Sequence, residues 1–194
     1  MEIQTNFINA AIKQFRYYKQ LGNRCFDQLS EEDQIFWSPN ESNNSIAVIV
    51  QHMSGNMLSR WTNFLTEDGE KEWRNRDGEF ECSISSSAEM ITKWEEGWHC
   101  LFLALESIDE NNFSQTVYIR NMGHTVVEAV QRQLCHYAYH VGQIVYLSKI
   151  LVQDFKSLSI PKAGSEAYNE LKFSKAKRRE HFTDDLIDGD KEQV

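Results

Sequence analysis

The sequence lacks the features of a membrane-spanning or secreted protein. Its 194 residues contain no apolar run of the roughly 18 residues that a membrane-spanning helix needs. The N-terminus, MEIQTNFINAAIKQF, has neither the basic start nor the apolar stretch of a signal peptide. The four cysteines are scattered and form no CxxC pair, which is typical of free thiols in a reducing compartment. We therefore expect a cytoplasmic protein with no membrane partner.

Positive charge is also in short supply. The 20 Lys and Arg residues are outnumbered by 29 Asp and Glu residues, so the formal net charge is −9. Proteins that bind nucleic acids neutralise phosphates with Lys and Arg, so neither DNA nor RNA is an expected partner. The basic cluster KAKRRE, at 175–180, is soon followed by the acidic DDLIDGDKE. We interpret residues 174–194 as a charged C-terminal tail that follows one folded domain, residues 1–173.

Proline is rare, and both prolines lie outside the periodic apolar segments. Apolar residues recur at steps of three and four in four segments. Ser86 with Glu89, and Thr125 with Glu128, have the spacing of capping boxes at two of the helix starts. These signals predict an all-α fold, a four-helix bundle with long connecting loops. The predicted helices span about 3–28, 43–66, 87–108 and 125–152.

The predicted connections are long enough to leave the order of the helices open. A crossover connection fits their lengths as well as simple up-and-down order does. The segment 109–124 contains QTVYIRNMG, which fits a short strand or hairpin.

Two histidines in LCHYAYHVGQ lie four residues apart on the last predicted helix. Positions i and i+4 share one helix face, so His136 and His140 point the same way, at the edge of the apolar stripe. His52 occupies the matching edge of the second predicted helix. Bundle cores are where helical proteins commonly build metal sites from facing side chains. Spacing alone also fits packed or hydrogen-bonded histidines, so both interpretations stay open.

The segments that carry these histidines resemble a known family. VIVQHMSGNMLSRW and RQLCHYAYHVGQIVYL look like the two motifs of the DinB-like superfamily. That superfamily includes YfiT-like metal-dependent hydrolases, bacillithiol transferases and the mycothiol-dependent maleylpyruvate isomerase. SLSIPKAGSEAYN, at 157–169, is similar to the C-terminal segment of an uncharacterised bacterial branch. The resemblance covers about residues 5–173.

The resemblance implies a four-helix bundle of the DinB-like type with a metal site of three histidines. His52 matches the first ligand, His136 the second and His140 the third. It also implies a frequent homodimer. The DNA damage in the superfamily's name refers to conditions of expression and implies no contact with DNA.

A site of three imidazoles leaves at least one coordination position open, as catalytic metal sites do. Nitrogen ligands suit several divalent ions, of which we expect zinc or nickel. The sequence identifies no carboxylate placed as a general base beside the histidines, and no catalytic side chain. We expect Arg60 and Gln133 at the mouth of the cleft, where they would bind a polar substrate. Alternatively, Arg60 is an ordinary solvated helix residue.

Our leading hypothesis is a metal-dependent transferase that joins a low-molecular-weight thiol to an electrophilic small molecule. A thiolate attacks directly and needs no base once formed, which favours this reaction over hydrolysis. One alternative is a metal-dependent hydrolase of small amides or esters. Another is a non-catalytic, metal-stabilised dimeric stress or binding protein.

Overall fold

The computed structural model describes residues 3–174 and 181–183, and the four predicted helices are present there. Most of the predicted charged tail, 174–194, lies outside the described residues. No helix in the described part of the chain is both long and apolar enough to cross a membrane. The elements, in chain order, are α1 (Ile3–Phe26), η1 (Glu32–Phe36), α2 (Ile46–Trp61), η2 (Gly78–Phe80), α3 (Ser87–Glu106), β1 (Thr116–Ile119), β2 (Met122–Thr125), α4 (Val126–Leu151) and α5 (Ser165–Phe173).

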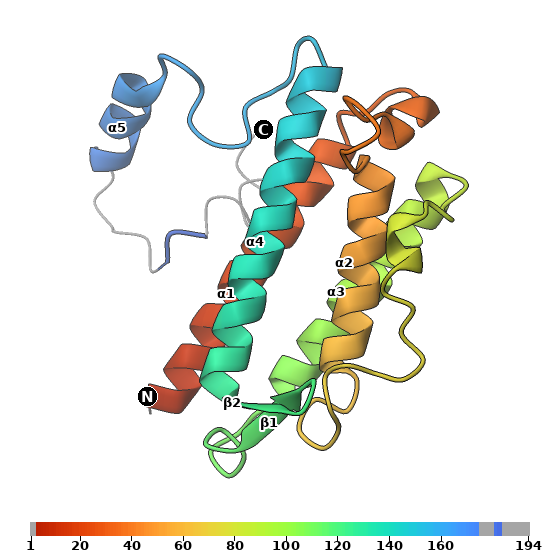
Figure 1. The fold of residues 1–194 in the computed structure, drawn as a ribbon. Coiled ribbons are helices and arrows are strands. Elements are labelled where there is room, and N and C mark those ends of the chain that lie inside the picture. Colours follow the sequence, from red (N-terminus) through yellow and green to blue (C-terminus); the bar gives the residue numbers. More distant parts are fainter. Residues whose placement is uncertain (1–2, 175–180, 184–194) are drawn as a thin grey trace.

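The four long helices form a bundle in which α1 packs along α4 and α2 packs along α3 (Figure 1). Contacts give the directions. Gly97 of α3 lies against Ser54 of α2, and Cys100 further along α3 reaches Thr62 beyond the end of α2, so these two helices are parallel. In contrast, Asn56 of α2 meets Tyr137 of α4, and His52 meets His140, so α2 and α4 are antiparallel. The fold confirms the four-helix bundle and contains the crossover that the loop lengths allowed.

The crossover is the connection between α2 and α3, residues 62–86. Parallel neighbours require the chain to return along the length of α2, and polar side chains of α2 hold it there. Ser59 donates to the carbonyl of Gly69, at 2.8 Å. Nearer the start of α2, Gln51 Nε2 donates to backbone carbonyls in and next to η2, including that of Glu79 at 3.0 Å. Gln51 and Ser59 are both buried, so the crossover is fixed as part of the domain.

The second helix is shorter than the predicted range of 43–66. Ser45 is the N-cap of α2, and its hydroxyl accepts from the backbone N–H of Val48 at 3.3 Å. At the other end, Asn63 adopts a left-handed backbone with φ of 48°. Asn tolerates this conformation better than most residues, and it cannot continue an α-helix. Thr62 is already extended, with ψ of 125°, so the helix ends at Trp61, and apolar periodicity detects neither this change of backbone nor the Ser45 cap.

Of the two predicted capping boxes, one forms completely. Thr125 and Glu128 each accept from the other's backbone N–H at the start of α4. At α3, Ser86 accepts from the Glu89 N–H at 3.2 Å, as predicted. The Glu89 carboxylate instead binds the backbone N–H and the hydroxyl of Ser85, both at 2.8 Å. Two donors on Ser85 outcompete the single N–H of the cap residue.

The 109–124 segment does contain a hairpin, in which β1 and β2 pair antiparallel and Ile119 is opposite Met122. Its two turn residues, Arg120 and Asn121, have φ of 55° and 61°, as a tight turn of two left-handed residues requires. Asp68 of the crossover accepts from both turn N–H groups at 2.8 Å. This contact fixes the hairpin beside the crossover. The short helix α5, which has no buried residues, lies outside the four predicted helices.

Aromatic side chains from all four long helices fill the centre of the bundle. Phe15 lies within about 6 Å of the rings of Trp61, Trp98 and Tyr137, measured between ring centroids. The Tyr137 hydroxyl donates to Asn56 Oδ1 at 3.0 Å and accepts from Trp61 Nε1 at 3.1 Å. This pairing ties α4 to α2 beside the histidines, because Tyr137 directly follows His136 and Asn56 lies one turn from His52.

Candidate metal centre

The three predicted ligands, His52, His136 and His140, come together between α2 and α4. Each offers one nitrogen, and these nitrogens all lie within 4.8 Å of one another. The Nε2 atoms of His136 and His140 are 3.0 Å apart, and the His52 ring lies 4.9 Å from the His140 ring between centroids. His52 and His140 are buried and His136 is half-buried. The three histidines, predicted at the edges of the apolar stripes of two helices, therefore lie close together where those antiparallel helices face each other.

His52 is held by a buried carboxylate that comes from the crossover. Its Nδ1 lies 2.8 Å from Glu79 Oε2. Arg74 grips the same carboxylate with two bonds, Nε to Oε1 at 2.7 Å and Nη2 to Oε2 at 2.9 Å. Because the carboxylate is an acceptor, the proton of neutral His52 resides on Nδ1, and its Nε2 carries the lone pair. Phe80 stacks on the His52 ring at 4.9 Å and fixes the ring plane.

The Glu79 carboxylate is ionised despite its burial. Burial by itself raises the pKa of this carboxyl, but the hydrogen bonds from His52 and Arg74 outweigh it and bring the pKa below its ordinary value. Its close approach to α2 depends on Gly55. A Cβ at that position would lie 2.5 Å from Glu79 Oε1. A glycine in the middle of a helix is costly, and here it leaves room for the carboxylate that orients His52.

His140 is oriented in the same way by a neighbour on its own helix. Its Nδ1 lies 2.8 Å from Gln143 Oε1, and Gln143 Nε2 in turn donates to the Tyr139 hydroxyl at 3.1 Å. In this arrangement the oxygen of the Gln143 amide faces His140 and its nitrogen faces Tyr139. His140 therefore carries its proton on Nδ1 and presents the Nε2 lone pair to the centre of the cluster.

The imidazoles of His136 and His140 on α4 stay neutral at pH values well below the ordinary histidine pKa of about 6.5. Burial, with the nearby His140 and His52, lowers the pKa of His136 to about 3. Burial also lowers the pKa of His140 to about 4; the Gln143 bond opposes this shift and His52 adds to it. Metal ligation requires neutral imidazole, so these environments keep the ligand form populated at neutral pH.

This arrangement fits a divalent metal ion. Without a cation, the Nε2–H of His136 donates to the Nε2 lone pair of His140 at 3.0 Å, and a cation bound among the three rings would take the place of this proton. Nitrogen ligands of a tetrahedral zinc ion with bonds of 2.0–2.1 Å lie about 3.3 Å apart, close to the His136–His140 spacing of 3.0 Å. Hydrogen-bonded Nδ1 atoms, as on His52 and His140, are the usual outer shell of metal-binding histidines. No other His, Cys, Asp or Glu of the described residues joins the cluster.

A cavity of about 310 Å³ opens beside the cluster, and its lining includes His52 and His136. The predicted substrate residues Arg60 and Gln133 line the same cavity. Arg60 is only 8% exposed, so the interpretation of Arg60 as a solvated surface residue is wrong. Its Nη1 donates to the Gly69 carbonyl and to Glu70 Oε2, the latter at 2.9 Å. That Arg60 and Gln133 bind a substrate remains a prediction.

Sequence reasoning missed the side chains that the crossover contributes. It found no carboxylate beside the histidines, whereas Glu79 lies next to His52. Arg74 and Phe80 were missed as well. They come from one dense stretch, WRNRDGEF at 73–80, whose mixture of charge and aromatic residues was the available signal. The path of a long loop depends on distant contacts such as those of Gln51, so spacing alone could not place it.

Comparisons with known proteins place the chain in a family. Searches of curated proteins and of solved structures found no match. The family model described as "Protein of unknown function (DUF1572)" matches residues 2–164, a range that includes all three histidines and the crossover. Because the match covers most of the sequence, the chain belongs to the DUF1572 family.

Proposed function

We propose that this protein is a metal-dependent transferase that joins a low-molecular-weight thiol to an electrophilic small molecule. The observation that carries the proposal is the buried cluster of His52, His136 and His140 beside a cavity. A site of three protein ligands leaves a position open to a reactant, whereas structural zinc sites are usually closed by four. A zinc or nickel ion bound there would lower the pKa of a thiol or water that reaches it.

The protein's own residues have three tasks in this proposal. Glu79 and Gln143 hold the imidazoles of His52 and His140 with their Nε2 atoms inward. Burial between α2 and α4 keeps water away from one side of the cluster. Arg60 and Gln133 line the open side, where they would orient the reactant.

The state of Glu79 favours thiol transfer over hydrolysis. Hydrolysis benefits from a base that takes a proton from water. The nearest carboxylate has both oxygens engaged, Oε1 with Arg74 and Oε2 with Arg74 and His52. It orients a histidine and has no free oxygen directed at the cavity. A thiol that has lost its proton attacks without such a base.

We also propose that the DUF1572 family is a branch of the DinB-like superfamily, and that the protein is a homodimer as the resemblance implies. Two observations support the relationship. The three histidines at the positions implied as ligands are the three that cluster. In addition, the helices form the implied four-helix bundle.

The proposal is tested by turnover of a chlorodinitrobenzene or an epoxide with a panel of thiols that includes bacillithiol. Each reaction is run with added zinc, with added nickel and without metal. We expect a metal-dependent rate that is lost in His136→Ala and kept in His99→Ala, a histidine that is exposed and outside the cluster. No rate above background with any thiol would overturn the transferase. Turnover of esters or amides without thiol would identify a hydrolase, and metal binding without any turnover would identify a non-catalytic protein.

A further inference from the structure

The cavity beside the histidines is strongly basic, although the protein as a whole is acidic. Of the residues that the structure describes, five arginines line it and no Asp or Glu does. The chain carries a formal net charge of −9, so this concentration of positive charge is local. The arginines come from α2, the crossover, the hairpin turn and α4, and they are Arg60, Arg74, Arg76, Arg120 and Arg132.

Nearby carboxylates neutralise only part of this charge. Glu70 is shared, since it is 2.9 Å from Arg60, 3.2 Å from Arg74 and 3.4 Å from Arg120. Glu79 pairs with Arg74, and the fully exposed Asp77 lies 3.9 Å from Arg76. Among the described residues these three carboxylates are the ion-pair partners of the five arginines, so two positive charges remain in excess.

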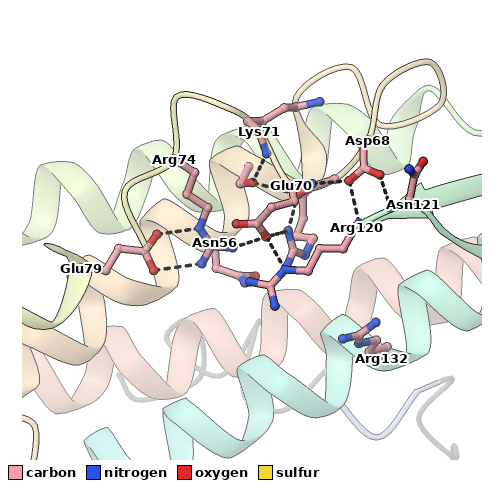
Figure 2. A network of polar contacts seen from close by, with 12 residues as sticks. Asn56, Asp68, Glu70, Lys71, Arg74, Glu79, Arg120, Asn121 and Arg132 are labelled. Carbon is pink, nitrogen blue, oxygen red and sulfur yellow. Dashed lines mark hydrogen bonds and ion pairs between the residues drawn. The ribbon is translucent and has the colours of Figure 1, made fainter. Parts of the chain in front are cut away.

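Arg132 carries the clearest unneutralised charge. Its Nη1 donates to His124 Nε2 at 2.9 Å, and within the described part of the chain no carboxylate forms an ion pair with it. Figure 2 shows Arg132 on α4, separate from the network of Glu70 and Arg120 and joined to it by no drawn interaction. The guanidinium groups of Arg120 and Arg132 therefore line the cavity from different elements, the hairpin turn and α4. Guanidinium groups placed in this way match the planar geometry of carboxylate and phosphate.

Two buried polar atoms of residues in the lining have no hydrogen-bond partner within the described part of the chain. They are Arg60 Nε, a donor, and Gln133 Oε1, an acceptor. The two side chains are 8% and 4% exposed. Buried polar groups are nearly always satisfied, and each one left unpaired costs free energy. A ligand in the cavity that offers an acceptor to Arg60 and a donor to Gln133 would satisfy both atoms once these side chains, whose unpaired atoms are closed to solvent, turn toward it.

We propose that this cavity binds the part of the substrate that carries two or more anionic groups, carboxylates or a phosphate, together with a hydroxyl or amide N–H. The volume of about 310 Å³ suits a small molecule. Placing the reactive end of that molecule at the histidines rests on the proposed function. Anion binding itself does not, because the arginines belong to the protein whether or not the site is catalytic.

The test is isothermal titration calorimetry on the full chain after metal has been stripped and the chelator removed, because a polyanionic chelator would compete for the cavity. Succinate probes the carboxylate source, glycerol phosphate the phosphate source, and neutral succinamide is the control ligand. The variants are Arg120→Gln and Arg132→Gln, with Lys162→Gln as a charge-matched control. Lys162 is exposed and lies outside the cavity, between α4 and α5.

We expect at least one of the two anions to bind at least about tenfold more tightly than succinamide, with binding that weakens as salt is added. Each arginine variant should lose about tenfold in affinity, and Lys162→Gln should lose none. Arg132 is exposed, so its variant keeps the fold, and melting of each variant checks this. Equal binding of anion and succinamide, or unchanged binding in both arginine variants, would overturn the proposal. Anion binding without any turnover in the thiol assay would leave this inference standing and remove the transferase.

Discussion

Adding one methyl group at Gly55 should weaken metal binding without touching a ligand. Gly55 lies in α2, one turn from His52, and a Cβ there would be 2.5 Å from Oε1 of Glu79 and 2.9 Å from its carboxyl carbon. Real Cβ atoms do not tolerate such contacts, so Glu79 must move. Its bonds to His52 and Arg74 would then lengthen or break. His52 would lose the partner that holds its Nε2 inward.

The size of the effect follows from what Glu79 does. Loss of an outer-shell partner of a metal-binding histidine typically costs 10–100-fold in metal affinity, or about 1.4–2.7 kcal/mol. Replacing glycine by alanine inside a helix stabilises it by about 1 kcal/mol. At Gly55 this gain competes with overpacking, which typically costs 1–3 kcal/mol. We therefore expect Gly55→Ala to be slightly less stable than wild type without metal, and clearly less stable with it.

The chain supplies a matched control in Gly142, which lies in α4 and is exposed. A Cβ there meets no atom of the described residues within 4 Å. Gly142→Ala should therefore gain the helix stabilisation of about 1 kcal/mol and keep wild-type metal affinity. Zinc titration by calorimetry and thermal melting, with and without zinc, measure both quantities for the two variants.

Equal zinc affinity in Gly55→Ala, Gly142→Ala and the wild type would refute the role of Glu79 in orienting His52. That result would mean that Glu79 does not orient a ligand, whatever its distance from His52. If both variants lost affinity equally, the cause would be general to alanine in these helices, and the steric argument about Glu79 would fail.

Zinc at about 100 times its wild-type Kd should stabilise the wild type by roughly 2.7 kcal/mol, a rise of about 5–11 °C in Tm. This stabilisation should be lost in His52→Ala, His136→Ala and His140→Ala and kept in His99→Ala. Equal shifts in Tm with zinc in all variants would exclude the site. Folded-state pKa values of about 3 and 4 lie below the ordinary value near 6.5, so the unfolded chain takes up protons first as the pH falls. The metal-free protein should lose stability below about pH 6.5, by up to about 1.4 kcal/mol per pH unit for each histidine, and chemical denaturation of His136→Ala should show a shallower slope. Light scattering at micromolar concentration should give twice 22.7 kDa, and a monomer alone would contradict the homodimer.

Helix geometry made part of this site predictable from sequence. In a helix the direction of each side chain depends only on its position, so the shared face of His136 and His140 followed from their spacing. His52 could be matched to the same kind of face, and the resemblance named all three as ligands. The apolar stripes likewise identified the four helices, because burial and helical period coincide. The Thr125 cap was predictable for the same reason, since all its partners lie within three residues.

Features that depend on distant partners could not be predicted in this way. The position of Glu79 is set by Gln51, 28 residues earlier, whose side-chain amide binds its carbonyl. Arg120 reaches the cavity because Asp68 holds the hairpin turn, 52 residues away along the chain. The exposed helix α5 buries no residue, so the burial that gives the long helices their periodic signal is absent there.

The crossover connects the topology of the bundle to the chemistry of its site. Because α2 and α3 are parallel, the chain must travel back beside α2 before α3 can begin. On that path it runs along the side of α2 that carries His52, and it places Glu70, Arg74 and Glu79 there (Figure 2). A simple up-and-down bundle would join α2 to α3 by a short turn at one end, and His52 would lack the carboxylate that orients it. The same connection that makes the helix order hard to predict therefore supplies the outer shell of the histidine cluster and part of the basic cavity beside it.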